Sequence, residues 1–250
     1  MTYLPLPRRG ATPRRVLTIA GSDSGGGAGL QADIRTCALL GVHALCAVTA
    51  VTVQNTVGVK GFHLVPDQVI AAQIDVVLHD IGFQAAKTGM LASPEIIAAV
   101  AAAWRDHSPD APLVVDPVCA SMHGDALLEP SGLETLRAEL FPLATLVTPN
   151  LHEVRLLVGI EVVDAETQRK AASALHALGP DGRWSKAGTC DRRSPAQTCC
   201  STAGSFTNSP RRASTPATTT ALVTRCRRRW RARLRTATPS RTRLRSASGG

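Results

Sequence analysis

The chain has 250 residues, of which 44% are hydrophobic and 3% aromatic. This length suits one sizeable α/β domain with a buried core, and the composition is that of a globular protein. The arginine-rich start is not followed by a signal-peptide stretch, and no apolar run approaches the roughly 18 residues that a membrane helix needs. We therefore expect a cytoplasmic protein without a membrane partner, in which residues 1–13 form a flexible N-terminus.

Short apolar runs and amphipathic stretches alternate from residue 16 onward. Val16–Ala20 predicts a strand, and residues 28–40, after a glycine-filled turn, have the apolar spacing of a helix. Residues 44–54 are rich in Val and Thr and predict a second strand. Pro66 and Asp67 begin a predicted helix that extends to residue 81, because proline is favoured in the first turn of a helix.

The same alternation continues through the middle of the chain. We expect strands at 83–87, 113–116 and 145–148, and helices at 94–104, 133–140, 153–158 and 164–178. Alternating strands and helices predict an α/β fold, with a mostly parallel sheet and helices on both faces. In such a fold the ligands bind at the carboxyl ends of the strands.

The regular pattern stops at Gly179-Pro180. Residues 1–180 hold 12 of the 28 basic and 17 of the 19 acidic residues, which leaves 16 basic and 2 acidic residues to the rest of the chain. Residues 181–250 are therefore strongly basic, and they show no helical or strand period. Their composition predicts disorder, with two origins open: a tail that binds nucleic acid, or a segment of foreign origin.

Polar clusters follow the predicted strands. A carboxylate or an amide at a strand end can recognise a heterocycle, a glycine turn lets the backbone approach a ligand, and oxygen groups at neighbouring strand ends suit magnesium and phosphate. Each cluster alone is as compatible with a loop or with core packing. The histidines His43, His107 and His123 show no partner pattern, and the cysteines lack the paired spacing of a zinc site. The clusters are Ala20-Gly21-Ser22-Asp23 with Gly26-Gly27-Ala28-Gly29, Gln31-Ala32-Asp33, Gln54-Asn55-Thr56, Lys87-Thr88-Gly89-Met90, Asp116-Pro117-Val118 and Thr148-Pro149-Asn150 with Glu153.

In this order and spacing the clusters resemble the hydroxymethylpyrimidine and phosphomethylpyrimidine kinases of thiamine biosynthesis, which have the ribokinase-like fold. The resemblance covers about residues 14–180 and implies an ATP-dependent phosphotransferase acting on an aminopyrimidine alcohol, its monophosphate, or both. It also implies magnesium as cofactor and a homodimer as the assembly of the intact family. The pyridoxal kinases share the fold but differ in the glycine turn, and they are the second choice.

The resemblance assigns roles to particular positions. Five residues would line the aminopyrimidine pocket, with Asp33 and Gln54 supplying its hydrogen bonds. Three further residues would position magnesium and the ATP phosphates, although none is identified as a direct metal ligand. The pocket set is Gly21, Asp33, Gln54, Met90 and Val118, and the ATP set is Asp116, Asn150 and Glu153.

Two motifs of the resembled family are missing after residue 180. These are a Val-Lys-Gly-Gly-His strand and a Gly-x-Gly-Asp or Gly-x-Gly-Cys turn, which forms the anion hole and carries the catalytic base. When codons are read one base out of phase, residues 181–189 can encode Trp-Ala-Val-Val-Lys-Gly-Gly-His. Residues 214–226 can likewise encode Asp-Thr-Gly-His-Asp-His-Gly-Ala-Gly-Asp-Thr-Leu. We infer that the reading frame is lost near Pro180-Asp181, and we expect the kinase fold to be incomplete at its C-terminal end.

The sequence therefore predicts a kinase domain at 14–180 followed by a basic, disordered segment at 181–250 that does not belong to the fold. Such a chain has no assigned catalytic residue, and we expect it to have little or no kinase activity. The alternative from another class is a non-catalytic domain with a basic tail that binds nucleic acid, since arginine clusters bind phosphates without sequence preference. It is the weaker reading, because the tail has few aromatics and no folded nucleic-acid motif.

Overall fold

A computed structural model describes residues 10–107, 111–120 and 127–180, and in addition the strands at 182–184, 197–202 and 205–210. The chain divides into two compact units, Met1–Ala213 and Ser214–Gly250, and all of the described residues belong to the first. Most of the predicted N-terminal segment, and the tail beyond residue 210, therefore lie outside the described residues.

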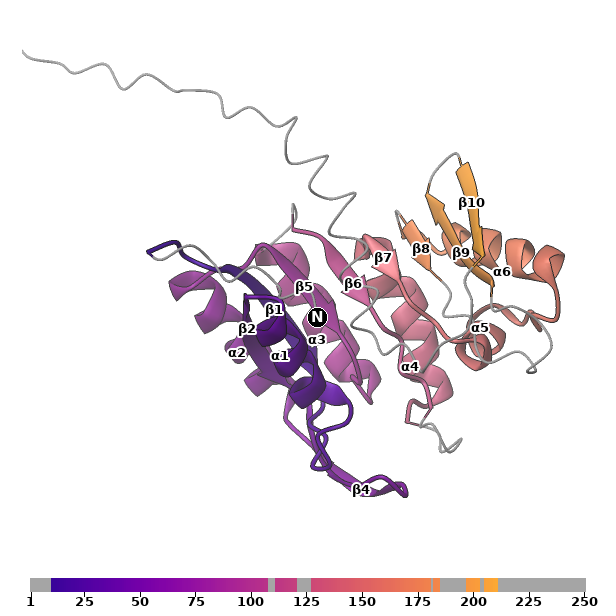
Figure 1. The fold of residues 1–250 in the computed structure, drawn as a ribbon. Coiled ribbons are helices and arrows are strands. Elements are labelled where there is room, and N and C mark those ends of the chain that lie inside the picture. Colours follow the sequence, from indigo (N-terminus) through magenta and orange to yellow (C-terminus); the bar gives the residue numbers. More distant parts are fainter. Residues whose placement is uncertain are drawn as a thin grey trace, which may run out of the picture. The chain divides into compact units, whose positions relative to one another are not determined.

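The first unit is built on an eight-stranded sheet in the order β10-β9-β8-β7-β6-β5-β1-β2 (Figure 1). The pairs from β2 through β8 are parallel, and β9 and β10 are antiparallel to their neighbours. This arrangement confirms the expected mostly parallel α/β fold. The strands are β1 Arg14–Ala20, β2 Val42–Val48, β5 Ala85–Thr88, β6 Leu113–Val115, β7 Leu146–Val147, β8 Gly182–Trp184, β9 Gln197–Thr202 and β10 Ser205–Pro210.

In the described part of the chain, α1 packs on β1 and β2, while α2, α3, α5 and α6 share one continuous apolar core with the strands. Helix α2 packs beside α3, and α3 packs beside α4 and its continuation, while α5 packs on α6. Strand residues such as Leu17, Ile19 and Val115 are fully buried against helix residues such as Ile70 and Ile97. The helices are α1 Gly29–Leu39, α2 Asp67–Asp80, α3 Pro94–His107, α4 Pro130–Thr135, which continues as a π-turn Leu136–Leu140 and a 3₁₀ turn Phe141–Leu143, α5 Leu151–Val158 and α6 Ala165–Ala177.

The single strand expected at 44–54 is wrong in detail, because the chain leaves the main sheet at Thr49. Residues Ala50–Gln54 form β3, which pairs antiparallel with β4, Val59–Leu64, in a separate two-stranded sheet that projects from the domain (Figure 1). The Asn55 side chain closes the hairpin by accepting hydrogen bonds from the N–H groups of Val57 and Gly58, at 2.9 and 3.2 Å. Asparagine favours such a turn, so Asn55 is the residue from which the hairpin could have been predicted.

Three strands lie in the stretch for which the sequence predicts no regular element. Strand β8 extends the sheet from β7 through the pair Val147↔Arg183, and β9 and β10 continue it as an antiparallel pair. An exposed sheet edge offers unpaired N–H and C=O groups to any extended segment, whatever its side-chain pattern. The assignment of residues 181–250 to a separate, disordered segment stays a prediction.

Among the described residues, none of the helices combines the length and the apolar content that crossing a membrane requires.

Candidate functional site

The glycine turn between β1 and α1 is organised by the buried carboxylate of Asp23. Its two oxygens accept hydrogen bonds from the N–H groups of Gly25, Gly27 and Ala28, at 2.7–2.8 Å. The Asp23 N–H donates in turn to the side chain of Gln31, at 2.7 Å. Asp23 therefore satisfies the N–H groups that precede α1 and holds the turn in one shape, a role that the sequence motif did not reveal.

Gly29 is required at the start of α1 by both its conformation and its surroundings. Its φ is +56°, and a Cβ at this position would lie 2.5 Å from the carbonyl oxygen of Gly21. Gly159, at the end of α5, has a similar φ of +70° but no atom within 4 Å of the same position. Substitutions at the two glycines therefore distinguish the cost of the left-handed conformation from the cost of a steric clash.

We expect Gly29→Ala to destabilise the protein more than Gly159→Ala. The left-handed conformation costs an alanine about 1–2 kcal/mol at either position, and at Gly29 the displaced backbone adds about 1–3 kcal/mol. The midpoints of thermal or urea unfolding of both variants measure the difference. Equal midpoints would show that the backbone of the glycine turn shifts to accommodate the Cβ without loss of stability.

Gly21 and Met90 are brought together at the carboxyl ends of the neighbouring strands β1 and β5. A Cβ on Gly21 would lie 3.5 Å from the sulfur of Met90 and 3.6 Å from the side chain of Ala50. The Thr49 hydroxyl fixes this segment by donating to the carbonyl oxygen of Met90, at 2.6 Å. Gly21 therefore lies beside the Met90 sulfur, with no side chain of its own between them.

Asp33, on the first helix, is held by β1 and β5. Its Oδ2 atom accepts a hydrogen bond from the Thr18 hydroxyl and forms an ion pair with the ammonium group of Lys87, both at 2.7 Å. The side chains of Lys87 and Asp33 are 18% and 15% exposed, so the pair is largely shielded from water. Both of these contacts fall on the same carboxylate oxygen, and binding of a substrate by Asp33 stays a prediction.

The thiols of Cys37 and Cys46 share the surroundings of Asp33. Burial and, to a smaller extent, the charge of Asp33 raise the pKa of Cys37 to about 11. Burial and the charge of Asp33 also raise the pKa of Cys46. Both thiols are therefore neutral at physiological pH and act as small, half-buried apolar groups.

Gln54 lies against the glycine turn at the end of β3. Its N–H donates to the Ser24 hydroxyl at 2.8 Å, and that hydroxyl donates to the Gln54 carbonyl oxygen at 2.6 Å. A Cβ on Gly25 would lie 3.4 Å from the Cα atom of Asn55. The backbone of the hairpin is therefore tied to the turn, while binding of a ligand by the Gln54 side chain stays a prediction.

The ends of β5, β6 and β7 carry oxygen groups on three adjacent strands. Thr88 pairs with Val115 and Val115 with Val147, so Asp116 and Thr148 follow neighbouring strands at the same level. The hydroxyls of Thr88 and Thr148 are buried without a hydrogen-bond partner within the described part of the chain. Buried hydroxyls in this state mark a position where a water, ion or ligand oxygen would be stabilised.

Asn150 and Glu153 form a capping box at the start of α5. The Asn150 side chain accepts from the Glu153 N–H at 2.8 Å, and the Glu153 carboxylate accepts from the Asn150 N–H at 2.7 Å. Nearby, burial raises the pKa of the Cys119 thiol to about 12, with the charges of Glu153 and Asp116 adding to the effect. The charges of Glu153 and Asp116 therefore both affect the Cys119 thiol. The capping box gives Asn150 and Glu153 a structural role, which the sequence analysis did not assign to them.

Val118 has a left-handed backbone conformation, with φ of +43°. This conformation is a genuine outlier for a β-branched residue, because its side chain collides with the backbone there. Such strain is concentrated at binding and catalytic positions. It falls at a residue that was expected to line the pocket.

We expect Val118→Gly to be more stable than Val118→Ala by about 1 kcal/mol, the reverse of the usual order. Both substitutions remove the isopropyl group, but only glycine adopts this φ without strain. Urea unfolding of the two variants measures the difference. An alanine variant at least as stable as the glycine variant would mean that the backbone at this position is not strained.

Among the residues that sequence reasoning missed, Lys87 is the most informative. It stood inside a motif but was given no role, and its partner Asp33 lies 54 positions earlier in the chain. A lysine at the end of a strand is compatible with many roles, so the sequence alone does not identify its partner. Its pairing with a carboxylate on the first helix arises only when β5 is placed beside β1.

Comparisons with known proteins show what the chain and its architecture are similar to. The sequence model described as phosphomethylpyrimidine kinase matches residues 23–220. The hydroxymethylpyrimidine/phosphomethylpyrimidine kinase of Mycobacterium tuberculosis is 72% identical over 180 residues, which cover 72% of this chain and 66% of that protein. The chain thus spans slightly less than two thirds of the length of this relative.

Several solved structures share the fold at identities above 30%. A crystal structure of phosphomethylpyrimidine kinase from Clostridium difficile has a TM-score of 0.72 and 37% identity, over 78% of this chain and 83% of that one. The pyridoxal kinase of Staphylococcus aureus in complex with AMP-PCP has a TM-score of 0.70 and 32% identity, over 78% and 71%.

The sheet topology and the solved structures place the fold in the ribokinase-like class of small-molecule kinases. Within that class, the match over residues 23–220 is specific: the chain belongs to the phosphomethylpyrimidine kinase family.

Proposed function

We propose that this chain derives from an ATP-dependent kinase of 4-amino-5-hydroxymethyl-2-methylpyrimidine, of its monophosphate, or of both, in thiamine biosynthesis. The family match supports this reaction. The observation that carries the proposal is the meeting of Gly21 with Met90, and of Asp33 with Lys87, at the ends of β1 and β5. In a parallel α/β sheet this edge is where ligands bind.

The substrate side of the site suits a flat, amino-substituted ring. The sulfur of Met90 offers a soft apolar surface to a ring face, and the neighbouring Gly21 has no side chain to cover it. Asp33 presents its remaining carboxylate oxygen to an exocyclic amino group, while Lys87 and Thr18 hold the other oxygen. Gln54 and Val118 complete the proposed pocket as an amide donor or acceptor and an apolar wall.

The residues at the ends of β5, β6 and β7, with Glu153 at the start of α5, fit magnesium and the ATP phosphates chemically. Asp116 and Glu153 supply carboxylate oxygens, and Thr88 and Thr148 supply hydroxyls that are buried without a partner among the described residues. Oxygen ligands are those that magnesium prefers. When bound, magnesium neutralises charge on the transferred phosphoryl group. Asn150 contributes by fixing Glu153 through the capping box.

The reaction requires positioning more than covalent chemistry from the protein. The hydroxymethyl oxygen forms a bond to the γ-phosphorus of ATP as the bond from that phosphorus to the leaving ADP oxygen breaks, and the alcohol proton passes to a base. The residues described here orient the alcohol. The base and the anion-hole turn of the resembled family are absent after residue 180, so we propose that this chain binds the pyrimidine but turns it over slowly or not at all.

Calorimetric titration of the full chain with the pyrimidine alcohol tests the binding half of this proposal. We expect the alcohol to bind, and pyridoxal, the ligand of the alternative class, to bind at least about tenfold more weakly, since the wrong polar edge leaves buried groups unpaired. Tighter binding of pyridoxal would favour a pyridoxal-type kinase. No binding of either compound by a folded chain would refute the proposed pocket.

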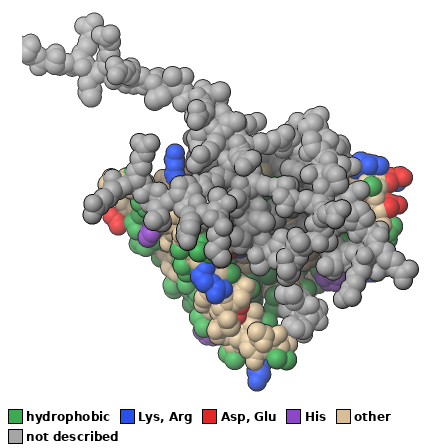
Figure 2. Space-filling view, viewed as in Figure 1, with side chains coloured by type: hydrophobic (Ala, Val, Ile, Leu, Met, Phe, Trp, Pro, Cys, Tyr) green, Lys and Arg blue, Asp and Glu red, His purple; other side chains and the backbone are tan. Residues whose placement is uncertain are grey.

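The assembly and the location belong to the same proposal. The projecting hairpin exposes Val51, Val53 and Phe62, at 52%, 61% and 43%, and hydrophobic side chains are visible on it at the bottom of the view in Figure 2. A second copy of the chain would cover such a surface, and light scattering tests for the homodimer.

Cys37, Cys46 and Cys119 are free thiols, which supports the reducing cytoplasm as the location.

A further inference from the structure

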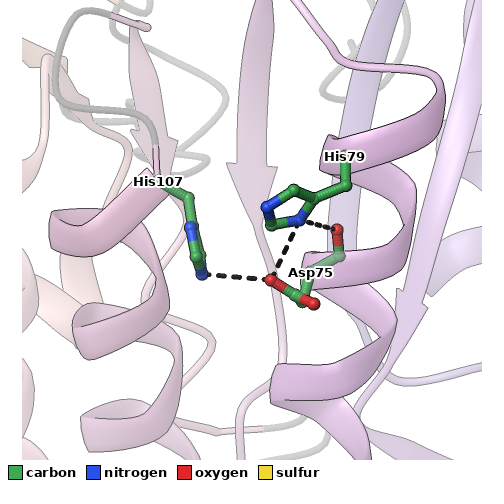
Figure 3. Close-up of side chains that lie close together, drawn as sticks. All are labelled: Asp75, His79 and His107. Atoms are coloured by element: carbon green, nitrogen blue, oxygen red, sulfur yellow. Dashed lines mark hydrogen bonds and ion pairs between the residues drawn. The ribbon is translucent and has the colours of Figure 1, made fainter.

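A cluster of two histidines and one aspartate lies on the surface where the C-terminal ends of α2 and α3 meet. Asp75 and His79 are four residues apart on α2 and so share one face of that helix. His107 is the last residue of α3. Figure 3 shows the three side chains pointing toward one another from the two neighbouring helices. Within the described ranges these are the residues whose ligand atoms gather within 4.8 Å of one another.

The distances in this cluster match the edges of a metal coordination shell. Oδ1 of Asp75 lies 3.1 Å from Nδ1 of His79 and 3.3 Å from Nε2 of His107. Ligands that surround a tetrahedral zinc ion at about 2.0–2.1 Å are about 3.3 Å apart. Charge-assisted hydrogen bonds between such groups are shorter, at about 2.7–2.9 Å.

The remaining distance, between Nδ1 of His79 and Nε2 of His107, shortens when an exposed side chain moves. The rings of His79 and His107 are 5.5 Å apart and meet edge to face, and the His79 side chain is 66% exposed. Nδ1 of His79 is also 2.9 Å from the backbone oxygen of Asp75. A metal ion would replace that contact when the ring rotates toward His107.

The electrostatic setting favours a cation at this point. His79 is in the last turn of α2 and His107 in the last turn of α3, so the negative ends of two helix dipoles converge on the cluster. Asp75 adds a full negative charge. The two histidines become ligands only in the neutral form, which leaves the cluster negative overall.

This cluster is separate from the proposed kinase site. The segment after α2 lies beside the starting end of β1, because Arg15 donates to the carbonyl oxygen of Ile81 and to the side chain of Gln84. The pocket residues lie at the opposite, carboxyl ends of the strands. A cation here is therefore not the magnesium ion of phosphoryl transfer.

We propose that Asp75, His79 and His107 form a binding site for a divalent transition metal such as Zn²⁺, which ties the end of α2 to the end of α3. Two imidazoles and one carboxylate are a ligand set that zinc uses, with water in the fourth position. Imidazole ligands select zinc and its neighbours over magnesium. No motif in the sequence indicates this site, because His107 lies on a different helix from its partners.

Zinc binding to the full chain tests the proposal directly. Equilibrium dialysis should find one Zn²⁺ whose affinity falls at least about tenfold in each of the variants Asp75→Asn, His79→Gln and His107→Gln, since the loss of even an outer contact costs about that much. Zn²⁺ at a hundredfold excess over its Kd should raise the Tm of the parent chain by about 5 °C. An equal concentration of Mg²⁺ should not change it.

Matched variants separate this site from other histidines and from the thiols. His43→Gln and His63→Gln replace exposed histidines on β2 and β4 and should leave zinc affinity unchanged. Co²⁺ bound in place of zinc should show visible bands without a thiolate charge-transfer band. Undiminished zinc binding in the triple variant Asp75→Asn/His79→Gln/His107→Gln, or a thiolate band in the parent chain, would place the metal elsewhere and overturn the proposal.

Discussion

Restoring the reading frame after Pro180 is expected to raise the turnover of the pyrimidine alcohol by at least about a hundredfold. The restored segment would supply the Val-Lys-Gly-Gly-His strand and the Gly-Ala-Gly-Asp turn that residues 181–226 encode one base out of phase. Donors of an anion hole alone contribute about 10²–10³ to kcat, and a positioned base contributes more. The measurement is ADP release with ATP and the alcohol, for the present chain and the frame-restored chain.

Two controls separate restored chemistry from restored folding. A chain that ends after residue 180 should show no gain, because it lacks both motifs. In the frame-restored chain, changing the aspartate of the Gly-Ala-Gly-Asp turn to asparagine should remove most of the gain while leaving the unfolding midpoint in place. Normal turnover by the present chain would refute the frame hypothesis. It would also be refuted if resequencing of codons 178–190 showed no change of frame and the frame-restored chain were inactive.

Asp33→Asn is expected to weaken binding of the pyrimidine alcohol by about 10–100-fold. A hydrogen bond to a charged group contributes about 1.5–3 kcal/mol, and asparagine keeps the size of the side chain while removing its charge. The same substitution leaves the shielded ammonium group of Lys87 without its partner, which lowers stability as well. Calorimetric titration gives the affinity, and urea unfolding gives the stability.

A double variant distinguishes these two effects. In Asp33→Asn/Lys87→Met the unpaired charge is gone, so stability should recover relative to Asp33→Asn alone, whereas affinity for the alcohol should stay low. Asp106→Asn, an exposed aspartate near the end of α3, should change neither quantity. If affinity recovered together with stability in the double variant, Asp33 would be a structural residue and not a ligand of the substrate.

Much of the fold followed from local patterns. The strand and helix periods are properties of short segments, so β1, α2, β5 and α3 were predicted close to their observed bounds. The expected helix at 133–140 is correct in position, but it divides into α4 and a π-turn. The hairpin of β3 and β4 was missed because Val and Thr favour any strand, and the sheet to which a strand belongs is decided by its partners.

The sequence by itself determined the kinase family, the alternating α/β architecture and the order of the polar motifs, because each depends on residue types at fixed spacings along the chain. Only the tertiary structure decided that Lys87 holds Asp33, that Met90 lies against Gly21, and that His107 meets Asp75 and His79. These contacts join segments that pack side by side while lying far apart in the chain. Their geometry depends on strand order and helix packing, and no local pattern of side chains records either.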